Sequence, residues 1–261
     1  MDLGLEGKVA LVIASSQGLG KACARELVKE GCHVMLTSRN EEKLEAAARE
    51  LAELHRGRVS HWVCDITKPQ AIRELVKYTH KVYGKIDILI NNSGGPPTGT
   101  FDDLTDEDWM ESFQLNLLSY IRIIRETLPY LKAKGGRIVN LASISVKTPL
   151  PGLILSNTFR SGVVGLSKTL AEELAPYQIL VNVVAPGQIA TDRIKSLNAD
   201  KARRLELPLE TVEKDALGKI PLGRYGTPEE FGKAVAFLVS EANTYITGST
   251  LLLDGGMAKV L

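Results

Sequence analysis

The sequence predicts a single α/β domain over residues 1–261, in which a doubly wound parallel sheet carries helices on both faces. Two observations support this prediction. Short apolar runs alternate with helical patterns along the whole chain, and no repeat, low-complexity tract or linker interrupts them. Strands that alternate with helices need crossover connections, which make neighbouring strands parallel and cover both faces of their sheet. The length is also normal for one large α/β domain.

The expected strands are short and apolar, as strands buried on both faces usually are. They lie at residues 8–14, 32–38, 58–65, 85–92, 136–142, 179–184 and 250–254. In a sheet of this kind, ligands bind outside the carboxyl ends of the strands, near the point where the strand order reverses. We therefore expect the functional residues directly after the strands.

The expected helices show apolar residues at helical spacing and begin at capping residues. They lie at residues 18–30 and 41–54, from 67 onward, from 105 onward, at 154–175, and from Thr227 and Pro228 onward. Thr67 with Gln70, and Thr105 with Asp108, have the spacing of a capping box. Both pairs therefore mark expected helix starts.

Charge and hydropathy argue against several classes of partner. The formal net charge is +1, which leaves no electrostatic footprint for nucleic acid or an anionic membrane. No uncharged apolar run reaches the ~18 residues that a membrane span needs. The first residues pass straight into a strand pattern without a basic segment, so we expect no signal peptide.

The cysteines and histidines indicate neither a disulfide framework nor a metal site. Cys23, Cys32 and Cys64 have no CxxC spacing. An odd and sparse set is typical of reduced thiols in an intracellular protein, so we expect a cytoplasmic location. The four histidines show no metal-ligand spacing, and we expect no metal.

A glycine-rich turn, "IASSQGLGK", follows the first expected strand. Gly18 and Gly20, with Leu19 between them, would let the backbone approach a pyrophosphate at the positive end of the following helix. The hydroxyls of Ser15 and Ser16 could add donors. The same kind of turn also occurs for packing alone, so both interpretations stay open here.

The ends of the second and third strands bear on the choice of cofactor. An acidic residue after the second strand suits the ribose of NAD, whereas an arginine suits the 2′-phosphate of NADP. Ser38 and Arg39 occupy this place, so we expect NADP(H) to be preferred and NAD(H) to be possible. Arg39 could instead be a solvated residue at a helix start. Asp65, before Ile66, could accept from an adenine amino group or cap the next helix.

Several longer motifs run along the rest of the chain. They are "NNSG" at 91–94, Asn116 in "LNLLS", "IVNLAS" ending at Ser143, "GVVGLSKTLAEELA" at 162–175, "VNVVAPGQIATD" at 181–192, "PLGRYGTPEE" at 221–230 and "YITGSTLLLDGG" at 245–256. With these motifs the chain resembles the short-chain dehydrogenase/reductase family, most closely its 3-oxoacyl-carrier-protein-reductase-like members. The resemblance covers nearly the whole chain and implies a Rossmann fold with a nicotinamide cofactor.

The resemblance also implies further cofactor residues. They are Asn91, Ser93, Gly94, Pro186, Gly187, Ile189 and Thr191. Gly94 would lie near the adenosine ribose, and the segment 186–191 would pass along the nicotinamide. Ile189 and Thr191 would hold its carboxamide.

The resemblance implies a mobile substrate lid and an oligomer as well. The charged segment at about 193–220 would be the lid, although a surface helix pair is the alternative. Members of the family are usually tetramers, built through the helix at 154–175 and the last helix and strand, so a homo-tetramer or dimer is expected. An exposed apolar side of that helix would carry Leu153, Phe159, Val163 and Leu170.

Two small departures from the family pattern lie in the cofactor motifs. The glycine loop of the family begins Thr-Gly, and Ile13 and Ala14 stand there instead. A Cβ at position 14 restricts the turn if the turn needs a positive φ. Ser93 replaces the alanine of "NNAG", a change that we expect to be neutral.

The main departure lies in the catalytic group, which in the family is Asn, Ser, Tyr and Lys. Asn116 and Ser143 match, but Ser156 and Arg160 stand in place of Tyr and Lys. These two positions are one helical turn apart and face the same site. A serine is a far weaker acid than a phenol of pKa ~10, and an arginine is a poor proton relay. Ser143, Ser156 and Arg160 could still stabilise an oxyanion, with water delivering the proton.

The function therefore has several interpretations. The first is an atypical NADP(H)-dependent oxidoreductase that interconverts a small carbonyl compound and an alcohol, with Asn116 in the catalytic group. The second is a non-catalytic relative that binds dinucleotide, and the third is non-redox chemistry in the same pocket. Halohydrin dehalogenases also carry Arg at position 160, but they keep the Tyr and lack the glycine loop. Tyr120, Ser145 and Lys147 lie near the catalytic positions, and we expect packing or solvent contact for each.

Overall fold

The computed structural model describes residues 2–260 and confirms the doubly wound α/β fold. The strands are β1 (Val9–Val12), β2 (His33–Ser38), β3 (Val59–Val63), β4 (Ile88–Asn91), β5 (Gly136–Leu141), β6 (Ile179–Pro186) and β7 (Thr250–Leu253). They form one seven-stranded sheet in the order β3-β2-β1-β4-β5-β6-β7, and every neighbouring pair is parallel. The order reverses between β1 and β4, which is where such folds bind their ligands.

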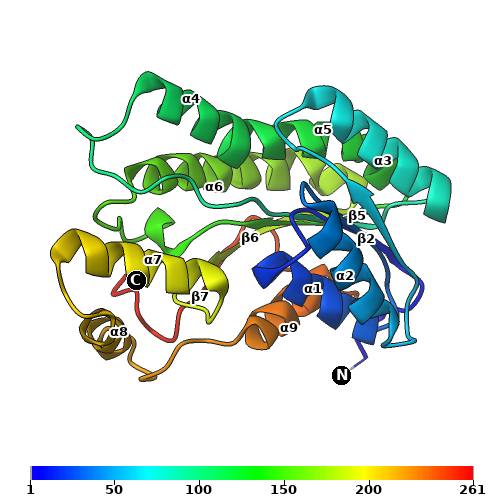
Figure 1. The fold of residues 1–261 in the computed structure, drawn as a ribbon. Helices are drawn as coiled ribbons and strands as arrows, with labels where there is room; N and C mark the ends of the chain where they lie inside the picture. The colour runs from blue at the N-terminus through cyan, green and yellow to red at the C-terminus, as the bar shows by residue number, and fades with distance from the viewer. Residues whose placement is uncertain (1, 261) are drawn as a thin grey trace.

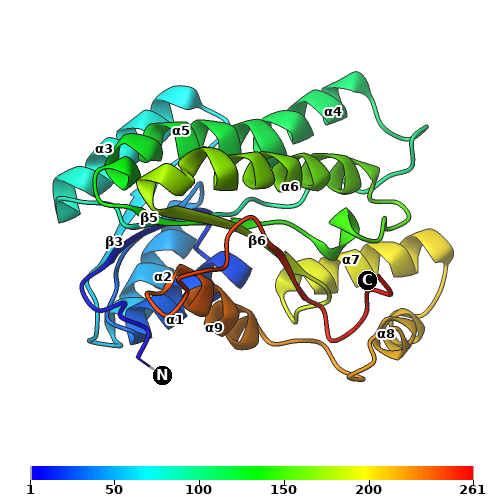
Figure 2. The same cartoon turned by 180° about the vertical axis from the view of Figure 1, so that it is seen from behind.

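Helices cover both faces of the sheet (Figures 1 and 2). They are α1 (Gly18–Lys29), α2 (Glu41–Ala52), α3 (Pro69–Tyr83), α4 (Asp106–Phe113), α5 (Ser119–Lys132), α6 (Ile154–Leu174), α7 (Asp192–Leu205), α8 (Leu209–Gly218) and α9 (Pro228–Val239). Helices α1, α2 and α9 lie on one face, and α3 to α6 lie on the other. A π-helical turn, Gln114–Leu118, joins α4 to α5.

Two hydrophobic cores lie on the two faces of the sheet, and β1 contributes to both. Ala10 and Val12 pack into the core beneath α1, α2 and α9. Leu11, and Ile13 directly after the strand, pack into the core beneath α3, α5 and α6. Successive side chains of a strand point to opposite faces, so a strand covered on both sides is apolar throughout. The uninterrupted apolar runs of the sequence follow from this arrangement.

Capping boxes fix the starts of two helices: that of α4, where the sequence predicts one, and that of α9, where the sequence predicts only the helix start. The side chain of Thr105 accepts from the backbone of Asp108, and the Asp108 carboxylate accepts in return from the Thr105 backbone. Thr227 and Glu230 make the same reciprocal pair, and Pro228 occupies the first position of α9. Each pair satisfies backbone donors that the first helical turn leaves free.

The capping box expected at Thr67 and Gln70 is wrong. Helix α3 begins at Pro69, and its N-cap is Lys68. Proline suits the first helical position because the N–H that it lacks has no partner there. Thr67 therefore lies outside the helix, where its hydroxyl donates to Asp65 over 2.8 Å.

The exposed apolar side expected on α6 is also wrong in part. Phe159 is buried within the chain, against the rings of Trp109 and Phe113, and Val163 has no exposed surface. Helix α4 covers this side of α6, a contact between distant segments that a helical pattern cannot reveal. Leu153 and Leu170 are half-buried.

The charged segment at 193–220 forms the pair of helices α7 and α8. Both views show this pair beyond one end of the sheet (Figures 1 and 2). Residues of both helices line the cavity described below, which is the place expected of a lid. Its mobility stays a prediction.

The cysteines are buried and form no disulfide bond, as expected of core thiols. Burial raises the pKa of both Cys32 and Cys64 to about 12, so these thiols stay protonated at neutral pH. Within residues 2–260, no helix combines the length and the apolar character that crossing a membrane requires.

Candidate functional site

A cavity of about 1730 Å³ lies at the carboxyl ends of the strands. The loops after β1, β2, β4, β5 and β6 form its walls, and α7 and α8 border it on the remaining side. Typical ligand pockets measure ~300–1,000 Å³, so this cavity has room for a dinucleotide together with a small substrate. It lies where the reversal of strand order predicts a ligand site.

Most of the residues expected at the site line this cavity. They are Ser16, Gly18, Leu19, Ser38, Arg39, Ile66, Ser93, Gly94, Ser143, Ser156, Arg160, Pro186, Gly187, Ile189 and Thr191. Five expected residues do not line it. They are Ser15, Gly20, Asp65, Asn91 and Asn116, and each has a structural contact that explains its position.

The turn between β1 and α1 leaves the amino end of α1 open to the cavity. Ala14, Gln17 and Gly18 line the cavity, and the first turn of α1 has neither a side-chain cap nor an acidic residue. Its free N–H groups and the helix dipole favour an anion there. Ala14 has a φ of 50°, so the turn does need the left-handed conformation that a glycine adopts more easily.

Gly20 and Ser15 hold this turn in place instead of facing the cavity. A Cβ at Gly20 would lie 2.3 Å from the carbonyl oxygen of Ala14, so the close approach of α1 requires a glycine. The Ser15 hydroxyl donates to the carbonyl of Val12 over 2.8 Å and accepts from the amide of Thr37 over 3.0 Å. Both residues therefore shape the turn, and phosphate binding by either of them stays a prediction.

Two cations border the cavity beyond β2. Arg39 lines the cavity and forms no ion pair with any residue in the range 2–260. Lys43 lines it as well, and its Nζ donates to Gln17 over 3.2 Å. Ser16, which also lines the cavity, donates to the hydroxyl of Ser38 over 3.0 Å. Sequence reasoning missed Lys43, which lies in the first turn of α2, four residues after Arg39.

Asp65 contacts its own loop. Its carboxylate accepts from the amide and the hydroxyl of Thr67 over 2.9 and 2.8 Å. Burial alone would raise the pKa of Asp65, but the hydrogen bonds from Thr67 outweigh it and hold the pKa below its usual value. Ile66, not Asp65, lines the cavity.

Two successive asparagines at the end of β4 have different surroundings. Asn91 is buried and donates to Asn140 over 2.9 Å, and Asn140 donates in turn to Ser167 over 2.8 Å, which ties β4 to β5 and α6. Asn92 lines the cavity and donates to the carbonyl of Ala14 over 3.2 Å. The alternation of side chains along a strand places only one of the two toward the ligand.

Arg160 is only 6% exposed and contacts neutral acceptors. Its Nη1 donates over 2.7 Å to the hydroxyl of Tyr120 and over 2.7 Å to the carbonyl of Leu141. Its Nη2 donates to the hydroxyl of Ser93 over 3.2 Å. Tyr120 donates to Leu141 over 2.9 Å, so this phenol packs behind the guanidinium and does not reach the cavity.

The hydroxyl of Ser93 accepts from two side chains. Asn116, in the π-helical turn, donates to it over 2.9 Å and to the carbonyl of Gly94 over 2.7 Å. Arg160 is the second donor. The expectation that serine in "NNSG" is a neutral change is therefore wrong, because an alanine would leave both donors without this acceptor.

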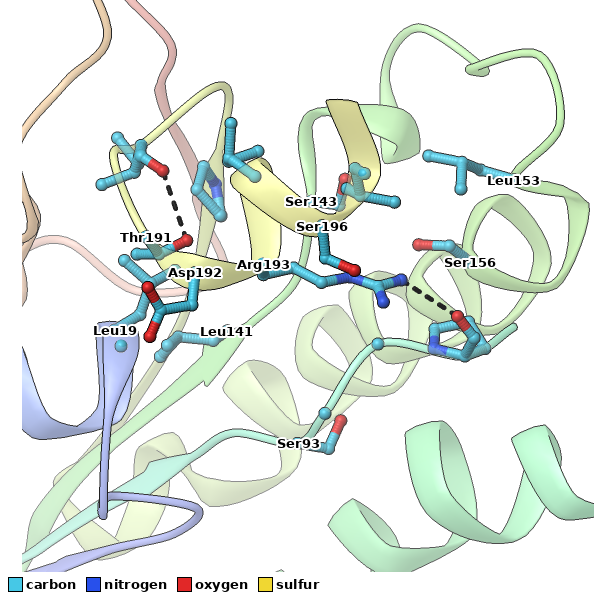
Figure 3. Close-up of a pocket in the computed structure, with 18 of the residues that line it drawn as sticks. Leu19, Ser93, Leu141, Ser143, Leu153, Ser156, Thr191, Asp192, Arg193 and Ser196 are labelled. Atoms are coloured by element: carbon cyan, nitrogen blue, oxygen red, sulfur yellow. Dashed lines mark hydrogen bonds between the residues drawn. The ribbon is translucent and has the colours of Figure 1, made fainter. Parts of the chain in front are cut away.

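Ser143 and Ser156 lie on the same side of the cavity, and the side chain of Arg193 extends toward Ser156 (Figure 3). Ser143, at the end of β5, accepts from the amide of Ser145 over 3.2 Å. Ser156 comes from the first turn of α6. No tyrosine or histidine within residues 2–260 lines the cavity, so a phenol or imidazole acid is not available there.

The fold and the cavity define the class of α/β proteins that bind a ligand at the carboxyl ends of a doubly wound sheet. Residues 13–258 match the family described as Enoyl-(Acyl carrier protein) reductase. The chain is 35% identical over 254 residues to a 3-oxoacyl-(acyl-carrier-protein) reductase of Thermotoga maritima, covering 97% of this chain and 98% of that protein. It is 36% identical over 254 residues to dehydrogenase/reductase SDR family member 4 of Oryctolagus cuniculus, covering 97% and 94%.

Solved structures agree with these relatives. L-sorbose reductase of Gluconobacter frateurii, in complex with NADPH and L-sorbose, has a TM-score of 0.94 and 33% identity over 100% of both chains. An actinorhodin polyketide ketoreductase variant with NADPH has a TM-score of 0.93 and 32% identity, covering 97% of this chain and 98% of that one. The chain belongs to the short-chain dehydrogenase/reductase family and is an oxidoreductase of that family.

Proposed function

We propose that this protein is an NADP(H)-dependent oxidoreductase that interconverts a carbonyl compound and an alcohol without the tyrosine acid of its family. One observation carries the proposal. A single cavity joins the open amino end of α1 and the cations Arg39 and Lys43 to the hydroxyls of Ser143 and Ser156. The NADPH complexes of the two structural relatives support the same choice of cofactor.

The residues around the cavity fit a phosphorylated dinucleotide. The first turn of α1 would hold the pyrophosphate, because its N–H groups have no side-chain cap. Arg39 and Lys43 would bind the 2′-phosphate, and an unphosphorylated ribose would leave both cations without a partner. The segment 186–191 would lie along the nicotinamide. When bound, this cofactor supplies the hydride.

The residues of this chain would polarise the substrate oxygen. Ser143 and Ser156 would donate hydrogen bonds to it, since both hydroxyls face the cavity. Arg160 would stabilise developing negative charge through its own charge, which neutral acceptors leave uncancelled. Asn116 would act through Ser93, as a positioning residue.

The proton would come from water. A serine hydroxyl is too weak an acid, and a guanidinium does not release its proton near neutral pH. Acid–base assistance contributes about 10² to 10⁴ in rate, so we expect a slow enzyme.

The test is NADPH oxidation, followed at 340 nm, over a panel of aldehydes, ketones and oxo acids. The proposal predicts slow oxidation that depends on the carbonyl compound. A protein that binds NADPH tightly and reduces no member of the panel would instead be a dinucleotide-binding relative without catalysis.

The family resemblance supports a homo-tetramer, or a dimer. Apolar side chains remain exposed beside the edge strand β7, where Tyr245 is 97% exposed and Leu251 is 38% exposed. Such a surface is suited to a second copy of the chain. Sedimentation velocity would reject this part of the proposal if it found only a 28.4 kDa species at micromolar concentration.

A further inference from the structure

Two guanidinium groups border the substrate end of the cavity, and neither pairs with a carboxylate among residues 2–260. Arg160 contacts the neutral oxygens of Ser93, Tyr120 and Leu141. Arg193 donates from Nη2 to the carbonyl of Pro96 over 3.0 Å. Arg160 is buried and Arg193 is exposed to the cavity, and two neighbouring cations without an anionic partner favour an anion at this end of the cavity.

Arg193 comes from the first turn of α7 and crosses the cavity to the loop after β4. Its guanidinium lies against Gly95, where a Cβ would be 2.6 Å from Nη2. Figure 3 shows the side chain extending away from Leu19 of the glycine loop and toward Ser156. Arg193 therefore points to the side of the cavity opposite the pyrophosphate site, where a substrate would lie.

The carboxylates near Arg193 already have cations of their own. Asp192 lies 3.5 Å from Lys195, and Asp200 pairs with Arg203. Partial removal from water lowers the pKa of Arg193. The negative charge of Asp200 raises this pKa, and the positive charge of Arg160 lowers it further. An arginine nevertheless stays protonated, so its free donors remain available to a ligand anion.

Several apolar side chains line the same cavity as Arg193. They include Leu115, Ile144, Leu150, Leu153 and Leu197. Apolar side chains together with the fork-shaped cation of Arg193 suit a carboxylate that is attached to a hydrocarbon body, because arginine binds both carboxylate oxygens in one plane.

We propose that the substrate is an oxo acid, or the corresponding hydroxy acid, whose carboxylate binds Arg193 while its carbonyl faces Ser143 and Ser156. The inference rests on the proposed function and names its substrate class. The net reaction is reduction of the oxo acid to the hydroxy acid, with NADPH as the reductant and water as the proton source. The carboxylate itself is unchanged.

The test is calorimetric binding to the full-length protein saturated with NADP⁺, which cannot reduce the ligand. The probes are benzoylformate and pyruvate, each compared with its methyl ester, which removes the charge and keeps the carbonyl. We expect at least one acid to bind about tenfold or more tightly than its ester, as a charge-assisted bidentate contact provides. Arg193→Met should abolish that preference and leave the affinity for NADP⁺ unchanged.

The matched control is Lys195→Met, which removes a cation from the same helix outside the cavity and should keep the preference. The proposal is overturned if neither acid binds at millimolar concentration, if the esters bind as well, or if Arg193→Met keeps the preference. It is also overturned if Arg193→Met weakens NADP⁺ binding by a similar factor.

A parallel assay with NADPH separates the two proposals. Preferred binding of acids without oxidation of NADPH by any carbonyl would refute the proposed function and support the carboxylate site. Faster reduction of the esters than of the acids would support the proposed function and refute the carboxylate site.

Discussion

The sequence motifs predict that Arg160 takes the place of a lysine of the family, and its contacts differ from those expected of a proton relay. It links the loop after β4, the end of β5 and the phenol of Tyr120 through hydrogen bonds to neutral oxygens. Ser93 completes this arrangement, because its hydroxyl accepts from both Arg160 and Asn116. The serine and the arginine therefore form a hydrogen-bonded pair. Under the proposed function this arginine would act through its charge, because a guanidinium does not lose its proton near neutral pH.

Replacing Ser93 by alanine tests this pair. We expect Ser93→Ala to lower the free energy of unfolding by about 1–3 kcal/mol, because two buried donors lose an acceptor. Urea unfolding followed by circular dichroism measures the loss. The control is Ser145→Ala, which removes a buried hydroxyl that has no partner among the described residues and should change stability little. Equal stability of the Ser93 and Ser145 variants would contradict the pairing.

The cations Arg39 and Lys43, which follow β2, lead to a prediction about the choice of nucleotide. The protein should bind NADPH more tightly than NADH, and Arg39→Asp should reverse the order. A charge-assisted contact contributes roughly 1.5–3 kcal/mol, or about one to two decades in affinity. Lys43→Met should weaken the binding of NADPH and leave the binding of NADH unchanged. Titration by nucleotide fluorescence gives the dissociation constants of the three proteins for both nucleotides. Equal affinities of the unaltered protein for NADPH and NADH would refute the role of Arg39.

At the scale of elements, the turn into α1 combines an open helix end with a strained backbone. Ala14 adopts a φ of 50°, a conformation that costs a residue with a Cβ roughly 1–2 kcal/mol. The turn persists because Gly20 lets α1 approach closely and because Asn92 donates to the Ala14 carbonyl. A glycine at this position would remove the strain.

Ala14→Gly should therefore stabilise the protein, by about 0.5–1 kcal/mol once the greater freedom of the unfolded chain is subtracted. Ala10→Gly, in the buried strand β1, is the opposite control and should destabilise it. Thermal unfolding of the three proteins decides the matter. A destabilised Ala14→Gly variant would show that the left-handed turn carries no strain.

The start of α9 depends on pH through Glu230. Hydrogen bonds from Arg224, followed by that from the Thr227 backbone, lower the pKa of Glu230 from 4.5 to about 2. The folded state therefore favours the charged carboxylate, and this stabilisation is complete above pH 4.5 and fades as the pH falls toward 2.

Glu230→Gln should accordingly lower the thermal midpoint at pH 6, and the difference from the unaltered protein should shrink as the pH falls below about 4.5. The exposed carboxylate of Glu111 in α4 provides the control, as Glu111→Gln. A difference between Glu230→Gln and the unaltered protein that stays constant from pH 6 to pH 3 would refute the role of this carboxylate.

At the scale of the whole molecule, the sequence predicts the sheet and its helices because buried parallel strands are apolar without interruption. It predicts most of the cavity because parallel strands end at one edge. It fails where distant segments meet. The burial of Phe159 depends on α4, and the acceptors of Arg160 come from three separate segments. The choice between Asn91 and Asn92 depends on strand register, which a motif does not state.

The central claim is that this cavity transfers a hydride although no phenol acid lines it. The most direct measurement is the mass of the alcohol formed from a carbonyl compound and NADPH deuterated at C4 of the nicotinamide. We predict an alcohol that carries the deuterium, formed in proportion to the NADPH oxidised. Ser143→Ala should slow its formation at least tenfold without weakening NADPH binding. An intact protein that binds the deuterated cofactor and forms no deuterated alcohol from any carbonyl compound would contradict the claim.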